Sequence, residues 1–214
     1  MIPAYNKLYL ENTRKNLGRL FDYVTYDLKI DLSDFISMFL KTKISKSIEK
    51  GTIKYCVGMS GIELSYHILD EFNYKYQKVK PIFMINKSVE YWCGWALAYF
   101  QWESSISFKE MFTYISIDEI KNMYNPYHEM DIRHFCEHMK ILYVNRKNET
   151  NLKIKRKKVG LTQKQLSELT NIPLRTIQQY EQRQKNINKA QADTLYALSK
   201  VLCCEMEELF EIYL

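Results

Sequence analysis

Apolar residues recur at helical spacing along most of the first two thirds of the chain. Between positions 8 and 29 they fall three or four residues apart, which is the pattern of a helix that buries one face. A second helix is expected to begin near Asp31 or Ser33, either of which can cap it, and to run to about Ile48. The N-terminal part is therefore predicted to be mostly helical.

The segments that follow are shorter. Residues 51–61 form a break, with a short extended piece expected at 52–57, and Ser60 is expected to cap a helix that ends near Phe72. The segment 81–85 is too short and apolar to assign. Further helices are predicted at residues 107–114, 116–123 and 127–142.

All three tryptophans of the chain lie within residues 88–103. Four aromatic residues there recur at i, i+4, i+8 and i+11, on one stripe of a predicted helix. Core packing is the usual reason for such a stripe, while an exposed stripe would be a surface for a partner or for self-association. In that second case the partner-binding residues would be Tyr91, Trp92, Trp95, Tyr99 and Trp102.

A short polar segment divides the chain. Residues 145–151 contain no large apolar side chain, so they are the expected linker between a domain at 1–144 and a domain at 152–214. The first of these is expected to bind a partner or to form oligomers.

Charge supports this division. Residues 145–200 carry thirteen Lys or Arg and four Asp or Glu, a net charge of +9, whereas residues 1–144 carry eighteen and seventeen, a net of +1. Four glutamates between 205 and 211 form a small acidic tail. A basic patch confined to one module favours a polyanionic partner, although a solvated charged face gives the same composition.

The most informative stretch is residues 161–182. It predicts two short helices joined by a tight turn, and the second helix has an apolar inner face and an outer face of Arg, Thr and Gln. A helix held by its back in this way can present its polar face to the edges of DNA bases.

From Leu152 the chain resembles the Cro/cI-type (Xre) helix-turn-helix family over about sixty residues. A first helix at 152–159 is closed by Gly160, and Thr162 caps a second at 163–169. Asn171 occupies the turn where the family usually has Gly, and Pro173 lies in the first turn of the third helix. The resemblance implies an all-α fold, with a C-terminal five-helix, lambda-repressor-like DNA-binding domain.

The resemblance also implies roles for individual residues. Arg can bind guanine O6 and N7, and Gln can bind adenine N6 and N7. The expected base-reading residues are Leu174, Arg175, Gln178 and Gln179, and the expected phosphate-binding residues are Gln163, Lys164, Thr176 and Arg183.

Three further positions follow from the resemblance. Arg156 and Glu181 match a structural ion pair between the first helix and the end of the third. The family usually has Gly soon after this glutamate, where the chain has Gln182 and Arg183, so a longer third helix is expected. Lys155 replaces a common apolar residue, and Ile154 is expected to take over its packing.

One motif suggests an enzyme. His134, Glu137 and His138 satisfy H-x-x-E-H, the inverted zinc-protease signature. A catalytic zinc site needs a third ligand and an open position, and His128 and Cys136 are badly placed to supply one. We therefore expect no enzyme activity, no cofactor and no metal.

The location is expected to be the cytoplasm. The N-terminus lacks an apolar stretch for a signal peptide, and the longest apolar run, 95–100, is too short to cross a bilayer. Five cysteines without C-x-x-C spacing fit a reducing compartment.

The whole chain is similar to helix-turn-helix regulators of low-GC Gram-positive bacteria (Firmicutes), through its motifs at 91–99 and 127–133. This similarity favours a dimeric repressor that binds a double-stranded DNA operator of its own operon. Some such genes lie beside toxin-like genes. The alternative is therefore an antitoxin, whose residues 1–144 neutralise a toxin while DNA binding serves autoregulation.

Overall fold

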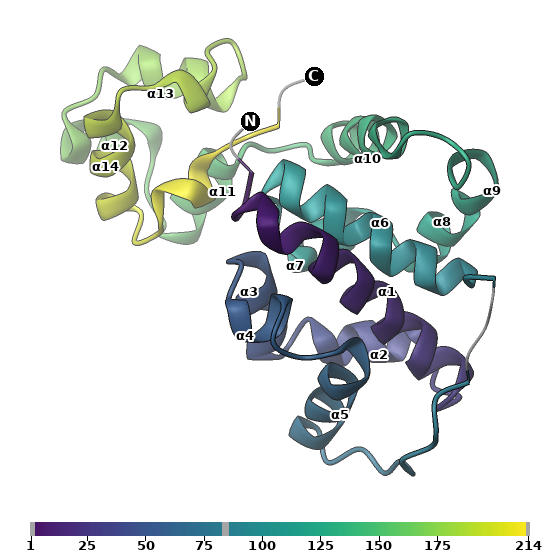
Figure 1. Cartoon of the computed structure of the whole chain (residues 1–214). Coiled ribbons are helices and arrows are strands. Elements are labelled where there is room, and N and C mark those ends of the chain that lie inside the picture. Colours follow the sequence, from purple (N-terminus) through teal and green to yellow (C-terminus); the bar gives the residue numbers. More distant parts are fainter. Residues whose placement is uncertain (1–2, 83–85, 213–214) are drawn as a thin grey trace. The chain divides into compact units, whose positions relative to one another are not determined.

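The computed structural model describes residues 3–82 and 86–212, and all regular elements within these ranges are helices (Figure 1). The all-α prediction is confirmed. The chain forms two compact units, Met1–Tyr143 and Val144–Leu214. No helix in the described ranges is both long and apolar enough to cross a membrane.

The core of the first unit is the pairing of α1 (Leu10–Tyr26) with α6 (Val89–Ser104), which lie side by side in Figure 1. The two backbones approach closely at Gly94, where an added Cβ would lie 2.3 Å from the carbonyl oxygen of Leu17. Helix α5 (Gly61–Glu71) approaches α1 in the same way, since a Cβ on Gly61 would lie 2.2 Å from the carbonyl oxygen of Asn16. Small residues thus set the spacing of the three helices.

The region after α1 corrects two expectations. The single helix expected at 31–48 is two helices, α2 (Leu32–Phe39) and α3 (Lys43–Glu49). Buried Thr42 separates them, because its hydroxyl donates to the carbonyl of Phe39 and accepts from the amide of Ser45. The extended piece expected at 52–57 is instead the helical turn α4 (Ile53–Cys56).

Two helices begin at the capping residues expected from sequence. Asp31 caps α2, and Ser60 forms a capping box with Glu63 at the start of α5. Of the unassigned segment 81–85, residues 83–85 lie outside the described ranges. The unit is completed by η1 (Lys7–Tyr9), α7 (Phe108–Tyr114), α8 (Ile117–Asn122), α9 (Tyr124–Tyr127) and most of α10 (Ile132–Arg146).

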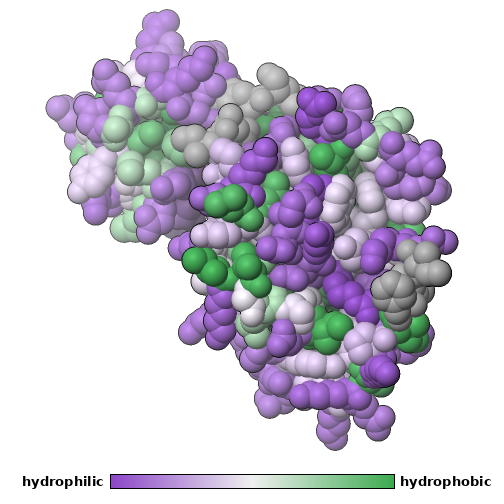
Figure 2. Space-filling model, viewed as in Figure 1, coloured by the Kyte–Doolittle hydropathy of each residue, from purple (hydrophilic) through white to green (hydrophobic). Residues whose placement is uncertain are grey.

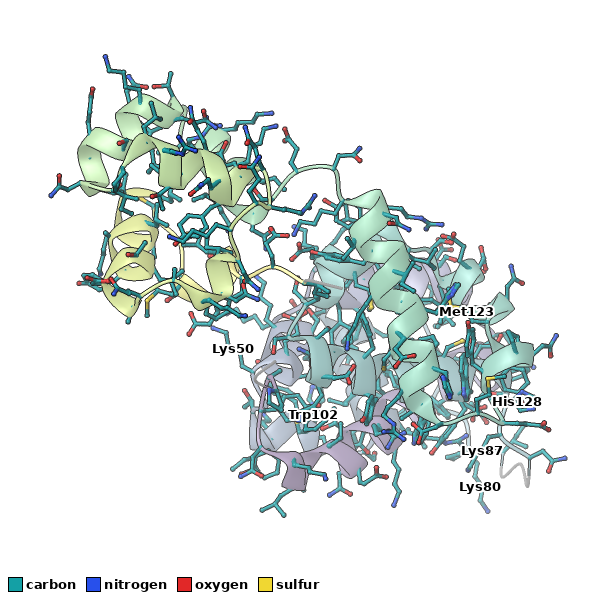
Figure 3. All side chains as sticks on the ribbon, turned by 90° about the horizontal axis from the view of Figure 1, so that it is seen from above. Lys50, Lys80, Lys87, Trp102, Met123 and His128 are labelled. Atoms are coloured by element: carbon teal, nitrogen blue, oxygen red, sulfur yellow. The ribbon has the colours of Figure 1, made fainter. Side chains whose placement is uncertain are left out.

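The aromatic stripe on α6 is half-buried, and its members make contacts within the unit. The guanidinium of Arg14 lies 3.4 Å from the ring centroid of Trp95, and the Trp102 indole donates a 2.8 Å hydrogen bond to the carbonyl of Tyr5 (Trp102 is labelled in Figure 3). Trp92, beside the stripe, is 7% exposed. These contacts support the packing interpretation of the aromatic cluster.

The second unit contains α11 (Asn151–Lys158), α12 (Gln163–Thr170), α13 (Leu174–Glu181), η2 (Ile187–Lys189), α14 (Ala192–Val201) and η3 (Met206–Leu209). The five expected helices correspond to α11–α14 and the short 3-10 helix η3, and η2 is an additional 3-10 turn. Ten buried residues form one core: Leu152, Leu166, Ile172, Ile177, Tyr180, Ile187, Leu195, Leu198, Leu202 and Leu209.

The segment 145–151 is the expected linker, and the ends of two helices lie within it. Helix α10 continues through Arg146, and α11 already begins at Asn151. Between these helices Lys147 and Thr150 are each only 1% exposed. Polar residues here are buried because they form hydrogen bonds inside the second unit, which composition does not reveal.

Candidate nucleic-acid interface

The turn between α12 and α13 is built by local hydrogen bonds. At the start of α12, Thr162 accepts from the amide of Gln165 at 3.1 Å, and the Gln165 side chain accepts from the amide of Thr162 at 2.9 Å. At its end, Asn171 adopts φ +56°, the left-handed conformation that Asn tolerates. The Ser167 hydroxyl then donates to the carbonyl of Ile172 at 2.6 Å. These contacts determine the direction in which α13 leaves the turn.

Helix α13 has one buried and one solvent-facing side. Ile177 and Tyr180 belong to the core, whereas Leu174 is 37% exposed and Arg175 is also exposed. Pro173 is its N-cap, one position before the expected place. Gln178 and Gln179 are half-buried.

The polar side chains on the outer side of α13 are available to a ligand. Within the described ranges, Arg175, Gln178 and Gln179 make no side-chain hydrogen bond or ion pair. Because these residues carry the donors and acceptors that match purine edges, the surface has the chemistry for base reading in a major groove.

One buried carboxylate connects three helices behind this surface. Glu181, the last residue of α13, accepts hydrogen bonds of 2.6 and 2.9 Å from Arg156 on α11. The hydrogen bond with Glu181 raises the pKa of the Arg156 guanidinium above its ordinary value. Gln163, the first residue of α12, donates to the same carboxylate at 2.7 Å. Helix α13 is therefore braced at its C-terminal end.

A shallow hollow of about 420 Å³ lies beside this brace. It is lined by Lys153, Arg156, Thr162, Gln163, Glu181 and Gln182. Three residues expected to bind phosphate lie nearby in sequence. Gln163, which lines the hollow, and exposed Lys164 lie in the first turn of α12, and half-buried Thr176 lies in the first turn of α13.

The chain after α13 corrects the expectation of a longer third helix. The helix ends at Glu181, and Arg183 has φ +57°, the left-handed conformation that the glycine of the resembled family would supply. The amides of Gln184 and Lys185 both donate to the carbonyl of Gln179, at 2.9 and 3.2 Å, which closes the turn. Arginine thus adopts the backbone conformation that glycine would supply, and its side chain is held from inside the unit.

Arg183 differs in this way from the other expected phosphate ligands. Its Nη2 donates a 2.9 Å hydrogen bond to the carbonyl of Lys147 and lies 3.8 Å from a carboxylate oxygen of Glu211. Its Nε is buried. The side chain is thus directed into the unit.

The basic run of α11 is partly neutralised by neighbouring acids. Lys153 and Lys157 both pair with Glu149, at 2.9 and 2.5 Å, and Lys155 pairs with Glu208 at 2.6 Å. Ion pairs at an exposed surface are weak, so the net positive field of the unit remains, but Arg175 is better placed than this run for specific contacts.

Sequence reasoning missed a polar cluster around buried Lys147 and Glu211, which also includes half-buried Asn151 and Arg183 and exposed Asn188. By sequence Glu211 belongs to the acidic tail, yet its side chain is only 2% exposed. Its partners lie 23 to 64 residues away along the chain, at separations that follow no motif. Only the fold brings them together.

The H-x-x-E-H motif does not assemble a metal site within the described ranges, where no group of three His, Cys, Asp or Glu residues could hold a metal. The side chains of His134 and Glu137 are 61% and 69% exposed and lie 3.8 Å apart. His128, which is labelled in Figure 3, instead stacks on the ring of Tyr124, with centroids 4.2 Å apart.

Comparison with known families places residues 152–209 in the family model HTH_3, described as helix-turn-helix. The matched range runs from the second residue of α11 to the end of η3. This part of the chain is therefore a helix-turn-helix domain, as expected from the Cro/cI-type resemblance, and it supports a DNA-binding regulator. Searches of curated proteins and of solved structures find no match.

Proposed function

We propose that the chain is a sequence-specific transcriptional regulator that acts in the cytoplasm as a dimer and represses its own operon. Leu174, Arg175, Gln178 and Gln179 read bases in the major groove. Gln163, Lys164 and Thr176 contact phosphates and set the position of the helix on DNA.

One observation carries this proposal. The outer face of α13 presents polar side chains without partners in the described ranges, while the carboxylate of Glu181 braces the end of the helix. A surface whose only role is solubility does not require a helix end that is fixed by a buried carboxylate. Rigid presentation of Arg and Gln suits recognition, because a bidentate contact requires both side-chain atoms to meet one base edge.

The dimer follows from the size of the reading surface. A single eight-residue helix reaches few base pairs, so two copies on a palindromic site supply the missing specificity. The half-sites are expected about 34 Å apart, one turn of DNA. A repressor that covers its own promoter would then be controlled by its own abundance.

The test is binding of the full chain to DNA upstream of its gene. Arg175→Ala with Gln179→Ala should abolish the preference for this DNA over a shuffled duplex. Lys200→Ala is the charge-matched control, because Lys200 is exposed on α14 and stacks on Tyr196. Unchanged selectivity in the double variant would show that α13 is not the reading surface, and a reporter fused to the promoter would test repression.

A second candidate is the antitoxin role, in which the first unit binds a protein partner. The observation that favours it is a basic face on α3 and α4 with apolar residues at its surface. Lys43 and Lys46 on α3 and its C-cap Lys50 are exposed at spacings of three and four residues. Ile53 on α4 and its C-cap Val57 are 59% and 41% exposed. Lys50 is labelled in Figure 3, and Figure 2 shows small apolar patches on a mostly polar surface. Such a face suits an acidic partner with apolar anchors.

This candidate is tested by co-expression with the protein encoded beside the gene. Co-purification that is lost with Lys46→Glu and Lys50→Glu, but retained with Lys200→Glu, would support the antitoxin role. If the neighbouring protein does not bind, or if it binds equally to all variants, this role for the face is ruled out.

A further inference from the structure

The polar cluster of the second unit centres on buried Glu211, whose side chain is 2% exposed. One carboxylate oxygen lies 3.7 Å from Nζ of Lys147, and the other lies 3.8 Å from Nη2 of Arg183. The same carboxylate accepts a hydrogen bond from the backbone amide of Asn151 at the start of α11, where the helix dipole favours negative charge.

The backbone around Glu211 is held as firmly as its side chain. Asn188 on η2 donates to the carbonyl of Glu211 at 2.7 Å and accepts from its amide at 2.9 Å. Asn151 donates to the carbonyl of Phe210 at 2.6 Å. The segment 210–212 is thereby bound both to the start of α11 and to the loop that follows the recognition helix.

Arg183 joins this cluster to the recognition helix. It lies two residues after the end of α13, and its Nη2 donates to the carbonyl of Lys147 at 2.9 Å. Nζ of Lys147 in turn donates to the Asn151 side chain at 2.6 Å. Any displacement of the end of α13 would therefore disturb a network of part-buried, charge-assisted hydrogen bonds.

We propose that Lys147, Arg183 and Glu211 are positioning residues for DNA recognition, which hold the C-terminal end of α13 in the orientation that its outer face needs to read bases. This inference rests on the proposed function. It assigns Arg183 an internal role in place of a phosphate contact, and it gives the 210–212 segment a part in specificity although that segment reads no base.

The two roles for Arg183 predict different salt dependences. A phosphate ligand contributes about 0.9 to the slope of log K against log salt concentration, and its loss weakens specific and non-specific DNA alike. A positioning residue leaves that slope unchanged, while the preference for specific DNA falls. Arg183→Gly is the informative variant, because glycine adopts the φ of +57° without strain and the turn itself is preserved.

Glu211→Gln gives an independent test, because simple electrostatics and the positioning role predict opposite effects on DNA binding. Removing a negative charge from a DNA-binding unit should strengthen binding by simple attraction. The proposal instead expects weaker specific binding, because the amide cannot hold two cations. Glu149→Gln is the matched control, since Glu149 is a partly exposed acid in the same unit and also pairs with two cations.

The probe is the duplex that the wild-type full chain selects from a random-sequence pool, compared with a shuffled duplex. Arg183→Gly and Glu211→Gln should each lower the ratio of specific to shuffled affinity about tenfold with an unchanged salt slope, while Glu149→Gln keeps the ratio. Arg183→Lys should retain part of the ratio, because a cation remains near Glu211. Circular dichroism checks folding, and Asn188→Ala replaces Glu211→Gln if the latter does not fold.

The outcomes distinguish failure of the proposed function from failure of the positioning role. If the wild-type chain selects no sequence, the proposed function fails. If it selects a sequence but the folded variants keep the wild-type ratio, or if Arg183→Gly lowers the salt slope by about one, the positioning role is overturned.

Discussion

Gln163 and Glu181 lie eighteen residues apart in sequence, and the side-chain amide of the first donates a 2.7 Å hydrogen bond to the carboxylate of the second. Arg156 binds the same carboxylate through two nitrogens. The first residue of α12 and the last residue of α13 are thus fixed to each other and to α11. Three helices of the domain are therefore joined at one buried carboxylate.

Loss of Arg156 should therefore lower the stability of the second unit. Arg156→Met leaves Glu181 buried without its cation, and the second unit should lose about 3–5 kcal/mol of stability to unfolding. The double variant Arg156→Met with Glu181→Leu should be more stable than this single variant, because no unpaired charge remains. Hydrogen exchange of the second unit measures the effect. A single variant at least as stable as the double would contradict the account.

Arg175→Lys should distinguish the effect of the positive charge from that of the planar guanidinium. Lysine keeps the positive charge but lacks the planar fork that binds guanine through two atoms, so specific affinity should fall by about 1–3 kcal/mol while non-specific affinity is retained. Titration of the selected and the shuffled duplex at several salt concentrations measures both quantities. An equal loss on both duplexes would mean that Arg175 contacts phosphate.

Asn171 should tolerate glycine better than alanine. Its φ of +56° costs a residue with a Cβ about 1–2 kcal/mol, a cost that glycine avoids and that asparagine reduces by local hydrogen bonding. Asn171→Ala should therefore lower the stability of the second unit, and Asn171→Gly should leave it almost unchanged. Thermal unfolding followed by circular dichroism measures the difference. Equal midpoints for the two variants would argue against a left-handed turn.

Gly94→Ala should destabilise the first unit alone. The new methyl group would lie 2.3 Å from the carbonyl oxygen of Leu17, and a backbone atom cannot move away as a flexible side chain can. Overpacking of this kind costs about 1–3 kcal/mol. All three tryptophans belong to the first unit, so their fluorescence reports its unfolding separately.

The control for this prediction is Gly58→Ala. Gly58 is exposed, and its added Cβ would come no closer than 3.1 Å to another atom, so a much smaller change is expected. Hydrogen exchange of the second unit should be the same in both variants. A shift of that unit on Gly94→Ala would show that the two units unfold together.

Local sequence determined much of the helix-turn-helix domain. Thr162 with Gln165 marks a helix start, Asn171 tolerates a left-handed turn, and the alternation of apolar and polar residues separates the two faces of α13. These features act between residues a few positions apart, so they are visible without the fold. The same holds for Asp31 and Ser60, whose side chains cap the next helix.

Tertiary structure alone decided the rest. Apolar spacing continued across residues 31–48, and only the buried hydrogen bonds of Thr42 divide that segment into two helices. Arg183 occupies the position of glycine, and its guanidinium reaches the carbonyl of Lys147, 36 residues away. Glu211 is buried together with partners that lie in three other segments of the chain. Burial of a charge depends on such distant partners, and their approach is a property of the folded chain rather than of any local pattern.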